Sequence, residues 1–179
     1  MYNIHLNKSR KIVTLSMLVA QAIVLSIIES FIPISFIIPG VKPGLANIVT
    51  IVSLYYFSLK DVLIIILVRS ILTALFSGNI YMFFFSMSGG ILSTLFMGLL
   101  IKKFRKYFST IGISVSGAFF HNLGQILVAY TIVKSSTIFF LLPILMISGI
   151  IMGCITGYIS YYLLNNLDGV FTEKYHSGK

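Results

Sequence analysis

Long apolar runs separated by short polar breaks dominate this chain. The runs occupy about 12–32, 44–59, 61–77, 80–101, 111–132 and 139–164. They are continuous rather than alternating, which predicts helices and not barrel strands. A membrane-spanning helix needs about 20 such residues, with about 17 as the lower limit, so the second and third runs are short. The pattern predicts an all-α, polytopic membrane protein built as a six-transmembrane-helix bundle.

Composition supports a membrane location. Of the 179 residues, 58% are hydrophobic and only 9% are charged, whereas a soluble domain averages about 25% charged residues. The net charge of +9 raises the question of nucleic acid binding. However, the basic residues flank the apolar runs, as they do in membrane proteins. We therefore expect membrane lipid around the chain and no nucleic acid partner.

The distribution of basic residues orients the predicted helices. Six spans leave both termini on one side, and that side carries ten of the thirteen Lys and Arg residues. Lys42 and Lys134 fall on the opposite side, and Arg69 lies inside a span. The positive-inside rule then predicts a multi-pass protein of the cell membrane with both termini in the cytoplasm. A cytoplasmic N-terminal segment (1–11) and a cytoplasmic tail (165–179) flank one transmembrane domain (12–164).

Two ionisable side chains lie within predicted spans. Arg69 is near the middle of the third span and Glu29 is near the outer end of the first. Each costs about 2.5–3.5 kcal/mol on insertion scales, so each is a candidate for function. One interpretation is that the two neutralise each other as a buried pair. The other is a ligand site in which an anion replaces or bridges the carboxylate, and the two interpretations are compatible.

The fifth span carries a face of small and polar residues. At 100° per residue this face collects Ser114, Gly117, Ala118, His121, Asn122, Gly124, Gln125 and Ala129. Such a face on an apolar helix looks toward other helices or a cavity. The glycines are explained by close packing. The polar side chains His121, Asn122 and Gln125 need hydrogen-bonding partners, either in a ligand or in a polar clasp between helices.

Small residues mark two further helix faces. Gly149, Gly153 and Gly157 form a double G-x-x-x-G in the sixth span, which predicts close helix packing, more readily within the bundle than against a second protein. The first span has two weaker ridges, Ser16 with Ala20 and Ala22 with Ser26. We expect these ridges to contact a membrane partner.

The outer loop between the first two spans has a defined shape. Its two Pro-Gly pairs, Pro39-Gly40 and Pro43-Gly44, specify successive turns. Lys42 lies between them and is expected to point back over the mouth of the bundle, although a simple helix connection with a snorkelling lysine is the alternative. Asn47 follows directly.

The sequence lacks the groups that several kinds of catalysis need. Its four acidic residues are Glu29, Asp61, Asp168 and Glu173, and they form no cluster for holding Mg²⁺ and a diphosphate. No G-x-x-x-x-G-K-[ST] motif for ATP occurs. Cys154 is the single cysteine, and His121 has no nearby Cys, Asp or second His. We therefore expect no catalytic residues, no metal and no cofactor, and energy for any uphill transport must come from a partner.

Two stretches resemble the signatures of a known family. They are Pro39-Gly40-Val41-Lys42-Pro43-Gly44-Leu45-Ala46-Asn47 and Gly117-Ala118-Phe119-Phe120-His121-Asn122-Leu123-Gly124-Gln125. They look like those of the Gx transporter family, which is also named heptaprenyl diphosphate synthase component I. The resemblance extends over about residues 10–165. Members are similar to the S components of bacterial energy-coupling factor (ECF) transporters.

The resemblance implies a fold, partners and a site. S components are six-helix proteins that capture a vitamin or related nutrient from outside, together with a transmembrane T component and two cytoplasmic ATPases. It implies a site in the outer half, roofed by the first outer loop, with the first helix touching the T component. S components often carry Ala-x-x-x-Ala on that helix, whereas this chain has Ser16/Ala20 and Ala22/Ser26.

These observations lead to one principal hypothesis and one alternative. The principal hypothesis is an S-component-like subunit of an ATP-driven importer for an anionic or amphipathic small molecule, with flavin-, quinone- and isoprenoid-related candidates unranked. Arg69, Lys42 and His121 would contact its polar or anionic groups, while neutral hydrogen bonds would come from Asn47, Asn122 and Gln125. Glu29 would pair with Arg69 when the site is empty. The alternative is a non-catalytic membrane accessory subunit of heptaprenyl diphosphate synthase, in isoprenoid or quinone synthesis.

Overall fold

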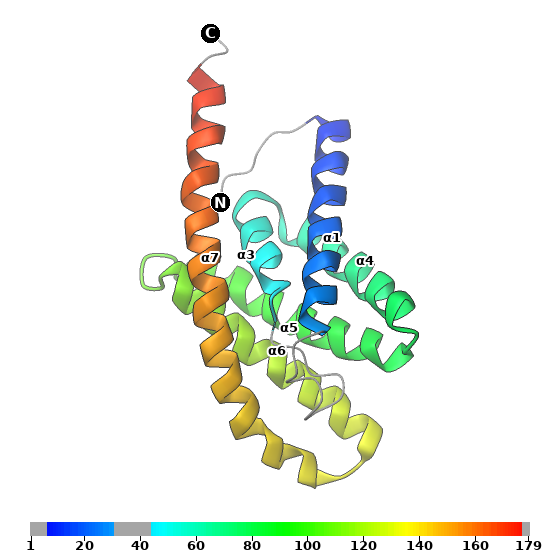
Figure 1. Cartoon of the computed structure of the whole chain (residues 1–179). Coiled ribbons are helices and arrows are strands. Elements are labelled where there is room, and N and C mark those ends of the chain that lie inside the picture. Colours follow the sequence, from blue (N-terminus) through cyan, green and yellow to red (C-terminus); the bar gives the residue numbers. More distant parts are fainter. Residues whose placement is uncertain (1–6, 31–43, 177–179) are drawn as a thin grey trace.

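The structure is a computed structural model that describes residues 7–30 and 44–176, and helices account for nearly all of them (Figure 1). The elements are α1 (Lys8–Ser30), α3 (Asn47–Tyr56), α4 (Leu59–Ser77), α5 (Ile80–Lys103), α6 (Thr110–Val133), a 3-10 turn η1 (Ser136–Leu141) and α7 (Leu142–His176). No strand occurs in these ranges. The expectation of an all-α protein is confirmed.

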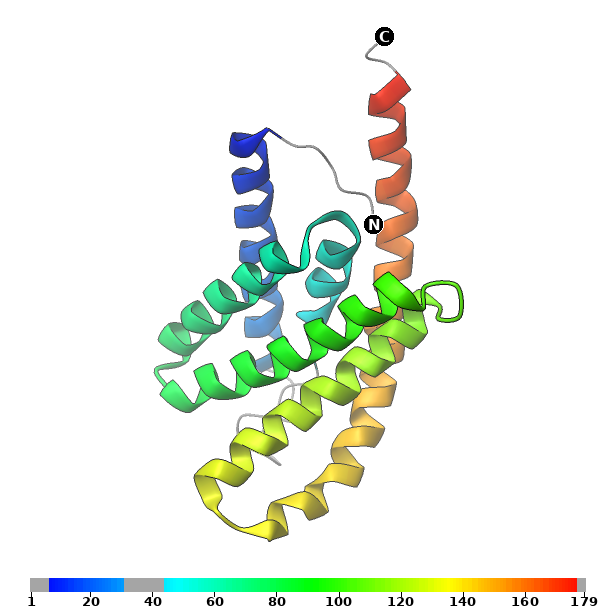
Figure 2. The ribbon, with the colours of Figure 1, turned by 180° about the vertical axis from the view of Figure 1, so that it is seen from behind.

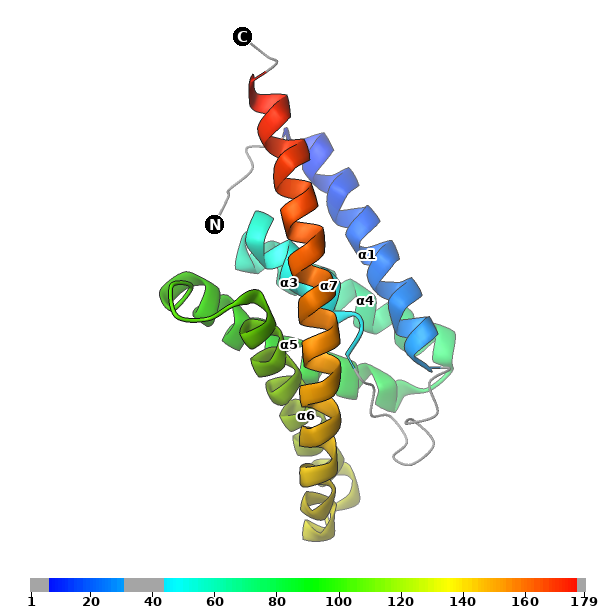
Figure 3. The ribbon, with the colours of Figure 1, turned by 60° about the vertical axis from the view of Figure 1, so that its left-hand side comes forward.

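The helices form a bundle around the short helix α3. Helices α5 and α6 run side by side along their lengths, and α4 and α7 pack against opposite sides of this pair (Figure 2). Helix α7 continues well past α6, toward the same end of the molecule from which α1 begins (Figure 3). The start of α1 and the end of α7 therefore lie at one end, and the cytoplasmic assignment of that end stays a prediction.

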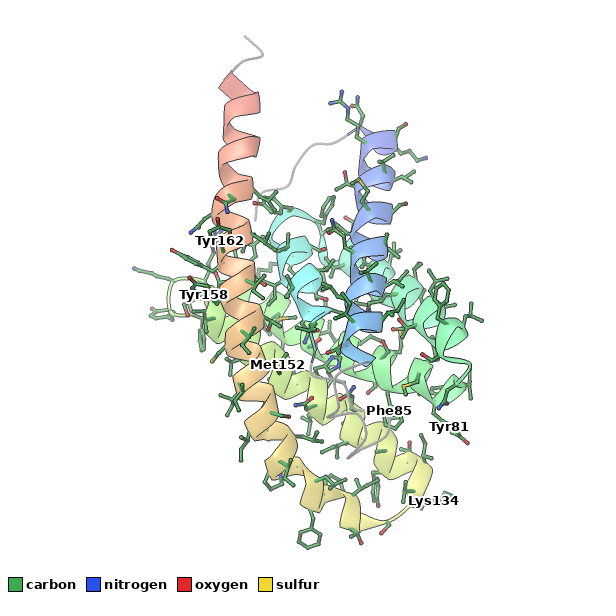
Figure 4. All side chains as sticks on the ribbon, viewed as in Figure 1. Tyr81, Phe85, Lys134, Met152, Tyr158 and Tyr162 are labelled. Atoms are coloured by element: carbon green, nitrogen blue, oxygen red, sulfur yellow. The ribbon has the colours of Figure 1, made fainter. Side chains whose placement is uncertain are left out.

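Four helical segments are long and apolar enough to cross a membrane. They are Lys8–Glu29, Ile80–Lys103, Thr110–Val133 and Ser136–Leu167. Large apolar side chains such as Leu75 (71% exposed) and Phe140 (82% exposed) point outward from the bundle, as is expected when lipid is the surrounding solvent. On α7, Tyr158 and Tyr162 also point away from the other helices (Figure 4). These features describe a membrane protein.

The two short predicted spans have a different form from full crossings. The run 44–59 becomes the ten-residue helix α3, about 15 Å long at 1.5 Å per residue, against a hydrocarbon core of about 30 Å. The run 61–77 becomes the 19-residue helix α4, whose length suffices but which contains Lys60, Asp61 and Arg69. Six complete crossings are therefore not confirmed.

A capping box explains why α3 and α4 are separate helices. Ser58 has extended backbone angles, its side chain accepts from the Asp61 N–H, and the Asp61 carboxylate accepts from the Ser58 N–H. This reciprocal arrangement satisfies donors that a helix start leaves unpaired. The same carboxylate forms an ion pair with Lys11 (Nζ to Oδ1, 2.8 Å), which joins α1 to α4.

Helix α3 lies at the centre of the bundle. All ten of its residues are buried, and Ile51 and Leu54 are completely inaccessible. They belong to a core cluster with side chains of α4, α5 and α6, among them Val62, Met97 and Ile113. Its polar residues Asn47, Thr50 and Ser53 are buried together with the apolar ones, so no face of α3 is left for solvent or lipid. The burial of α3 fixes its first residue, Asn47, in the interior.

Glycines bring the helix backbones close together. A Cβ added at Gly124 would lie 2.8 Å from the Ser88 carbonyl oxygen and 2.9 Å from the Gly89 Cα, so α5 and α6 touch backbone to backbone. On α7, Gly153 and Gly157 stand equally close to Cα atoms of α6. Gly149 lies against the Asn122 amide, also on α6. The double G-x-x-x-G thus packs within the bundle.

The two small-residue ridges of α1 face in different directions. Ser16 and Ala20 are exposed, whereas Ala22 (1% exposed) and Ser26 (5% exposed) are buried in the bundle. Six residues separate the starts of the two ridges, which rotates one about 240° from the other at 100° per residue. Of the four residues expected to contact a partner, the structure thus leaves Ser16 and Ala20 accessible and packs Ala22 and Ser26 inside the bundle, and the partner contact itself stays a prediction.

Candidate functional site

A polar pocket of about 350 Å³, including its open mouth, lies where the end of α1 and the start of α3 meet α4, α5 and α6. Its lining consists of Ser26, Glu29, Gly44, Ala46, Asn47, Arg69, Thr73, Met82, Ser86, His121 and Gln125. Charged, amide, hydroxyl and imidazole groups from five helices and the turn before α3 therefore converge on one space. Such convergence marks a binding site more strongly than any single polar residue.

Arg69 is the only lysine or arginine among the described residues of this lining. It lies in the third turn of α4, with 3% of its surface exposed. Gly90 of α5 makes room for it, because a Cβ there would come within 3.3 Å of the Arg69 Nη2 atom. Among the residues that the structure describes, Nε of Arg69 has no hydrogen-bond partner. A buried guanidinium with a spare donor is suited to an oxyanion.

Glu29 joins the end of α1 to the turn before α3. It is 2% exposed, and its Oε1 atom accepts hydrogen bonds from the backbone N–H groups of Gly44 and Leu45. Gly44 has a φ of 96°, a conformation that glycine adopts without strain. The charges of Glu29 and Arg69 also attract each other. Glu29 thus anchors the turn before α3 to the end of α1, in addition to its interaction with Arg69.

Two amide side chains and one hydroxyl of the polar lining have an atom without a partner among the described residues. Asn47, Thr73 and Gln125 are at most 4% exposed. Within the described part of the chain, Asn47 Oδ1, Thr73 Oγ1 and Gln125 Oε1 have no hydrogen-bond partner. Leaving a buried polar atom unpaired costs about 1–3 kcal/mol. These atoms therefore need partners that enter the pocket, such as water or a ligand.

His121 lines the same pocket from α6. It is 5% exposed, and Gly89 of α5 lies against it, because a Cβ at Gly89 would come within 2.9 Å of the His121 Nδ1 atom. Beside it, the hydroxyls of Ser70 and Ser86 are 3.0 Å apart and link α4 to α5. No three His, Cys, Asp or Glu side chains gather anywhere in the described ranges.

The predicted site residues separate into three groups. Glu29, Asn47, Arg69, His121 and Gln125 come together around the pocket. Asn122 does not line it, because its amide nitrogen donates to the Leu145 carbonyl oxygen of α7 at 2.6 Å. Lys42 lies outside the described residues. Asn122 is thus a clasp between helices.

Some lining residues were not predicted as ligand contacts. Ser26 was assigned to a partner-facing ridge, although its position three residues before Glu29 on the same helix face already pointed inward. Ser86 belongs to a group of small residues on α5 and carried a weak signal. Met82 had no sequence signal, because a methionine in an apolar run is ordinary.

The fold and the pocket define a class: an α-helical membrane protein that encloses a charged, polar pocket within its bundle. A family model described as heptaprenyl diphosphate synthase component I matches residues 18–163, which includes every lining residue of the pocket. The match extends over more than half of the chain, and the chain belongs to this family. The resemblance found in the two signature stretches is confirmed. No curated protein and no solved structure matches the chain at a significant level.

Proposed function

We propose that this chain is the membrane-embedded substrate-binding subunit of an ECF-type importer and captures a small molecule with an anionic group from the outer side. The observation that carries the proposal is Arg69. It is 3% exposed in a pocket with Asn47 and Gln125, and its Nε has no partner among the described residues. Burying a charge and several polar groups in a membrane protein is costly, and an oxyanion ligand recovers that cost.

The position of the pocket supports capture from outside. Glu29 and Gly44, which line it, bracket the loop 31–43 that the charge distribution assigns to the outer side. Lys42 of that loop is proposed as a further cationic contact. With cytoplasmic termini and six membrane segments, of which α3 is an incomplete crossing, the chain would follow the S-component plan.

Transport then requires partners. The sequence has no ATP-binding motif, so a transmembrane T component and cytoplasmic ATPases would supply the energy. The exposed face of α1, with Ser16 and Ala20, is the proposed contact for the T component, because small side chains allow another helix to approach closely.

Native mass spectrometry of protein extracted gently from its host membrane tests this function. We expect a retained metabolite together with a T component and ATPases. The metabolite should be lost in Arg69→Ala and His121→Ala, and retained in Arg105→Ala, which removes an exposed cation of the α5–α6 loop. Retention in all three variants, with uptake unchanged, would show that the pocket is not the binding site.

The family description favours a second candidate. A non-catalytic accessory subunit of heptaprenyl diphosphate synthase would co-purify with a prenyl synthase and would affect the release of product from the membrane. The same spectrum separates the candidates. A prenyl synthase in place of the T component and ATPases, with no retained metabolite, would establish the accessory role and remove the importer proposal.

A further inference from the structure

Among the described residues, the pocket lining contains one buried charge of each sign. Arg69 is 3% exposed and Glu29 is 2% exposed, and both line the same space. A purely anionic ligand at Arg69 would be brought close to the Glu29 carboxylate in a medium that screens charges weakly. A ligand that also carries a positive charge avoids this repulsion, because the carboxylate then attracts it. The pairing of charges therefore favours a ligand with both signs.

The pocket atoms without a hydrogen-bond partner in the described ranges include both donors and acceptors, so a ligand that pairs with all of them must itself carry both. Arg69 Nε is a donor, so it needs an oxygen. Asn47 Oδ1 and Gln125 Oε1 are acceptors, 2% and 1% exposed respectively as residues, and in the described ranges nothing donates to them. A phosphate monoester dianion offers oxygens but no donors, and inorganic HPO₄²⁻ offers a single O–H donor. A protonated amine offers three N–H donors for these acceptors.

The size of the pocket points to a small ligand. Its empty space is about 350 Å³, and this figure includes the open mouth, so the enclosed part is smaller still. Among the described residues, most side chains that line it are polar or charged, and Ala46 and Met82 are apolar.

Resting on the proposed function, we infer that the pocket binds a small zwitterion, with an oxyacid group at Arg69 and a protonated amine directed to Asn47, Gln125 and the Glu29 charge. The oxyacid is a carboxylate or a phosphate. Amino acids and O-phosphoethanolamine represent these two sources. The inference excludes an isoprenyl diphosphate as the primary ligand of this pocket.

The test measures binding to the full chain in lipid nanodiscs by calorimetry. The probes are the protein amino acids, O-phosphoethanolamine, inorganic phosphate and farnesyl diphosphate. For each zwitterion that binds, the matched acid without the amine is measured too. We expect the zwitterion to bind at least about tenfold more tightly than the matched acid, the lower end of what a hydrogen bond to a charged group contributes.

Two variants and a control assign the binding to the pocket. Arg69→Gln should weaken binding of the zwitterion by tenfold or more. Glu29→Gln keeps an oxygen for the Gly44 and Leu45 N–H groups but removes the charge. The preference for the zwitterion over the matched acid should therefore fall severalfold, and the part that remains comes from the acceptors of Asn47 and Gln125. Arg105→Gln should change neither. Because the Glu29 test is a ratio of two affinities measured on the same folded variant, a loss of stability does not imitate it.

Each other outcome overturns the inference. If farnesyl diphosphate or inorganic phosphate binds at Arg69 while no zwitterion does, the ligand class is wrong, although a binding subunit remains. If Glu29→Gln leaves the preference for the zwitterion over the matched acid unchanged, the Glu29 charge does not attract the amine and the inference is wrong. If no probe binds and no metabolite is retained from the host membrane, both the inference and the proposed function fail.

Discussion

Asn122 and Gln125 show how one helix face serves two purposes. They lie about 60° apart around α6 at 100° per residue, and both are buried. The Asn122 amide donates to Leu145 of α7, whereas Gln125 opens onto the pocket with an unpartnered Oε1 in the described structure. At the residue scale, we therefore expect Asn122 to contribute to stability and Gln125 to ligand binding, and mutation can separate the two effects.

Gln125→Leu should raise stability and weaken binding. The leucine has a similar volume and removes a buried acceptor without a partner, so we expect a gain of up to about 1 kcal/mol in the empty protein. The measurement is thermal unfolding in detergent, with Gln21→Leu on the exposed side of α1 as the control. A stability loss above about 1 kcal/mol would mean that Gln125 holds the bundle together instead.

Asn122→Ala should have the opposite signature. Loss of the hydrogen bond to Leu145 should cost about 1–2 kcal/mol of stability, because the carbonyl oxygen is left without that donor. Ligand affinity should stay within about twofold. Comparing unfolding temperature and ligand affinity in both variants gives the result, and a selective loss of affinity in Asn122→Ala would return this residue to the ligand site.

At the scale of elements, glycines determine how near the helices stand and so set the shape of the pocket. Gly89 and Gly124 meet where α5 crosses α6, next to His121. Gly90 accommodates Arg69. Replacing these glycines by larger residues would separate the helices and displace His121 and Arg69. The short helix α3 contributes by placing Asn47 inside the bundle, because its whole surface is buried.

Gly124→Ala should therefore destabilise the protein by several kcal/mol. The added Cβ meets backbone atoms of Ser88 and Gly89 at 2.8–2.9 Å, which cannot move as a flexible side chain would. Gly112→Ala, in the first turn of the same helix, makes only ordinary contacts at 3.4 Å and beyond. It should be neutral or stabilising by up to about 1 kcal/mol. Equal effects in the two variants would refute the close crossing.

Ser58→Ala probes the boundary between α3 and α4. It removes the side chain that caps α4 and the reciprocal contact with Asp61. The expected loss is about 1 kcal/mol. Lys11→Ala, which breaks only a partly exposed ion pair, should cost less than that. Denaturation of both variants under the same conditions provides the comparison.

At the scale of the whole molecule, the helix ends define two sides. The start of α1 and the end of α7 share one end of the molecule (Figure 1), and α5 and α6 are each long and apolar enough to cross a membrane. We therefore expect the loop containing Tyr107 and the turn containing Ser135 to lie on opposite sides. The excess of basic residues predicts that the first of these is cytoplasmic.

Cysteine labelling tests this orientation. Cys154 is free and exposed, so the background is Cys154→Ser. In intact cells a membrane-impermeant thiol reagent should label Ser135→Cys and not Tyr107→Cys, and permeabilised cells should show labelling of both. The reverse pattern would place the pocket mouth toward the cytoplasm and remove the argument for capture from outside.

The sequence by itself determined the helical membrane class and the inward face of α6. It also singled out Arg69 and Glu29, which the structure buries in the pocket. It did so because hydrophobic runs and the 100° helical repeat are local properties, and because a charge in an apolar run is costly wherever the run packs. The match to the family model confirms that the two signature stretches were enough to recognise the family.

Only the tertiary structure decided which neighbours each inward side chain meets. Periodicity grouped Asn122 with Gln125, but the position of α7 made the first a clasp. Small residues suggested two equivalent ridges on α1, but packing of the bundle buried Ala22 and Ser26 and left Ser16 and Ala20 outside. Apolar length suggested a crossing at 44–59, but the cap at Ser58 ended that segment as the ten-residue α3. The first two outcomes depend on contacts between segments distant in the chain, which no local pattern encodes. The cap at Ser58 is local, and only the complete burial of α3 depends on the tertiary structure.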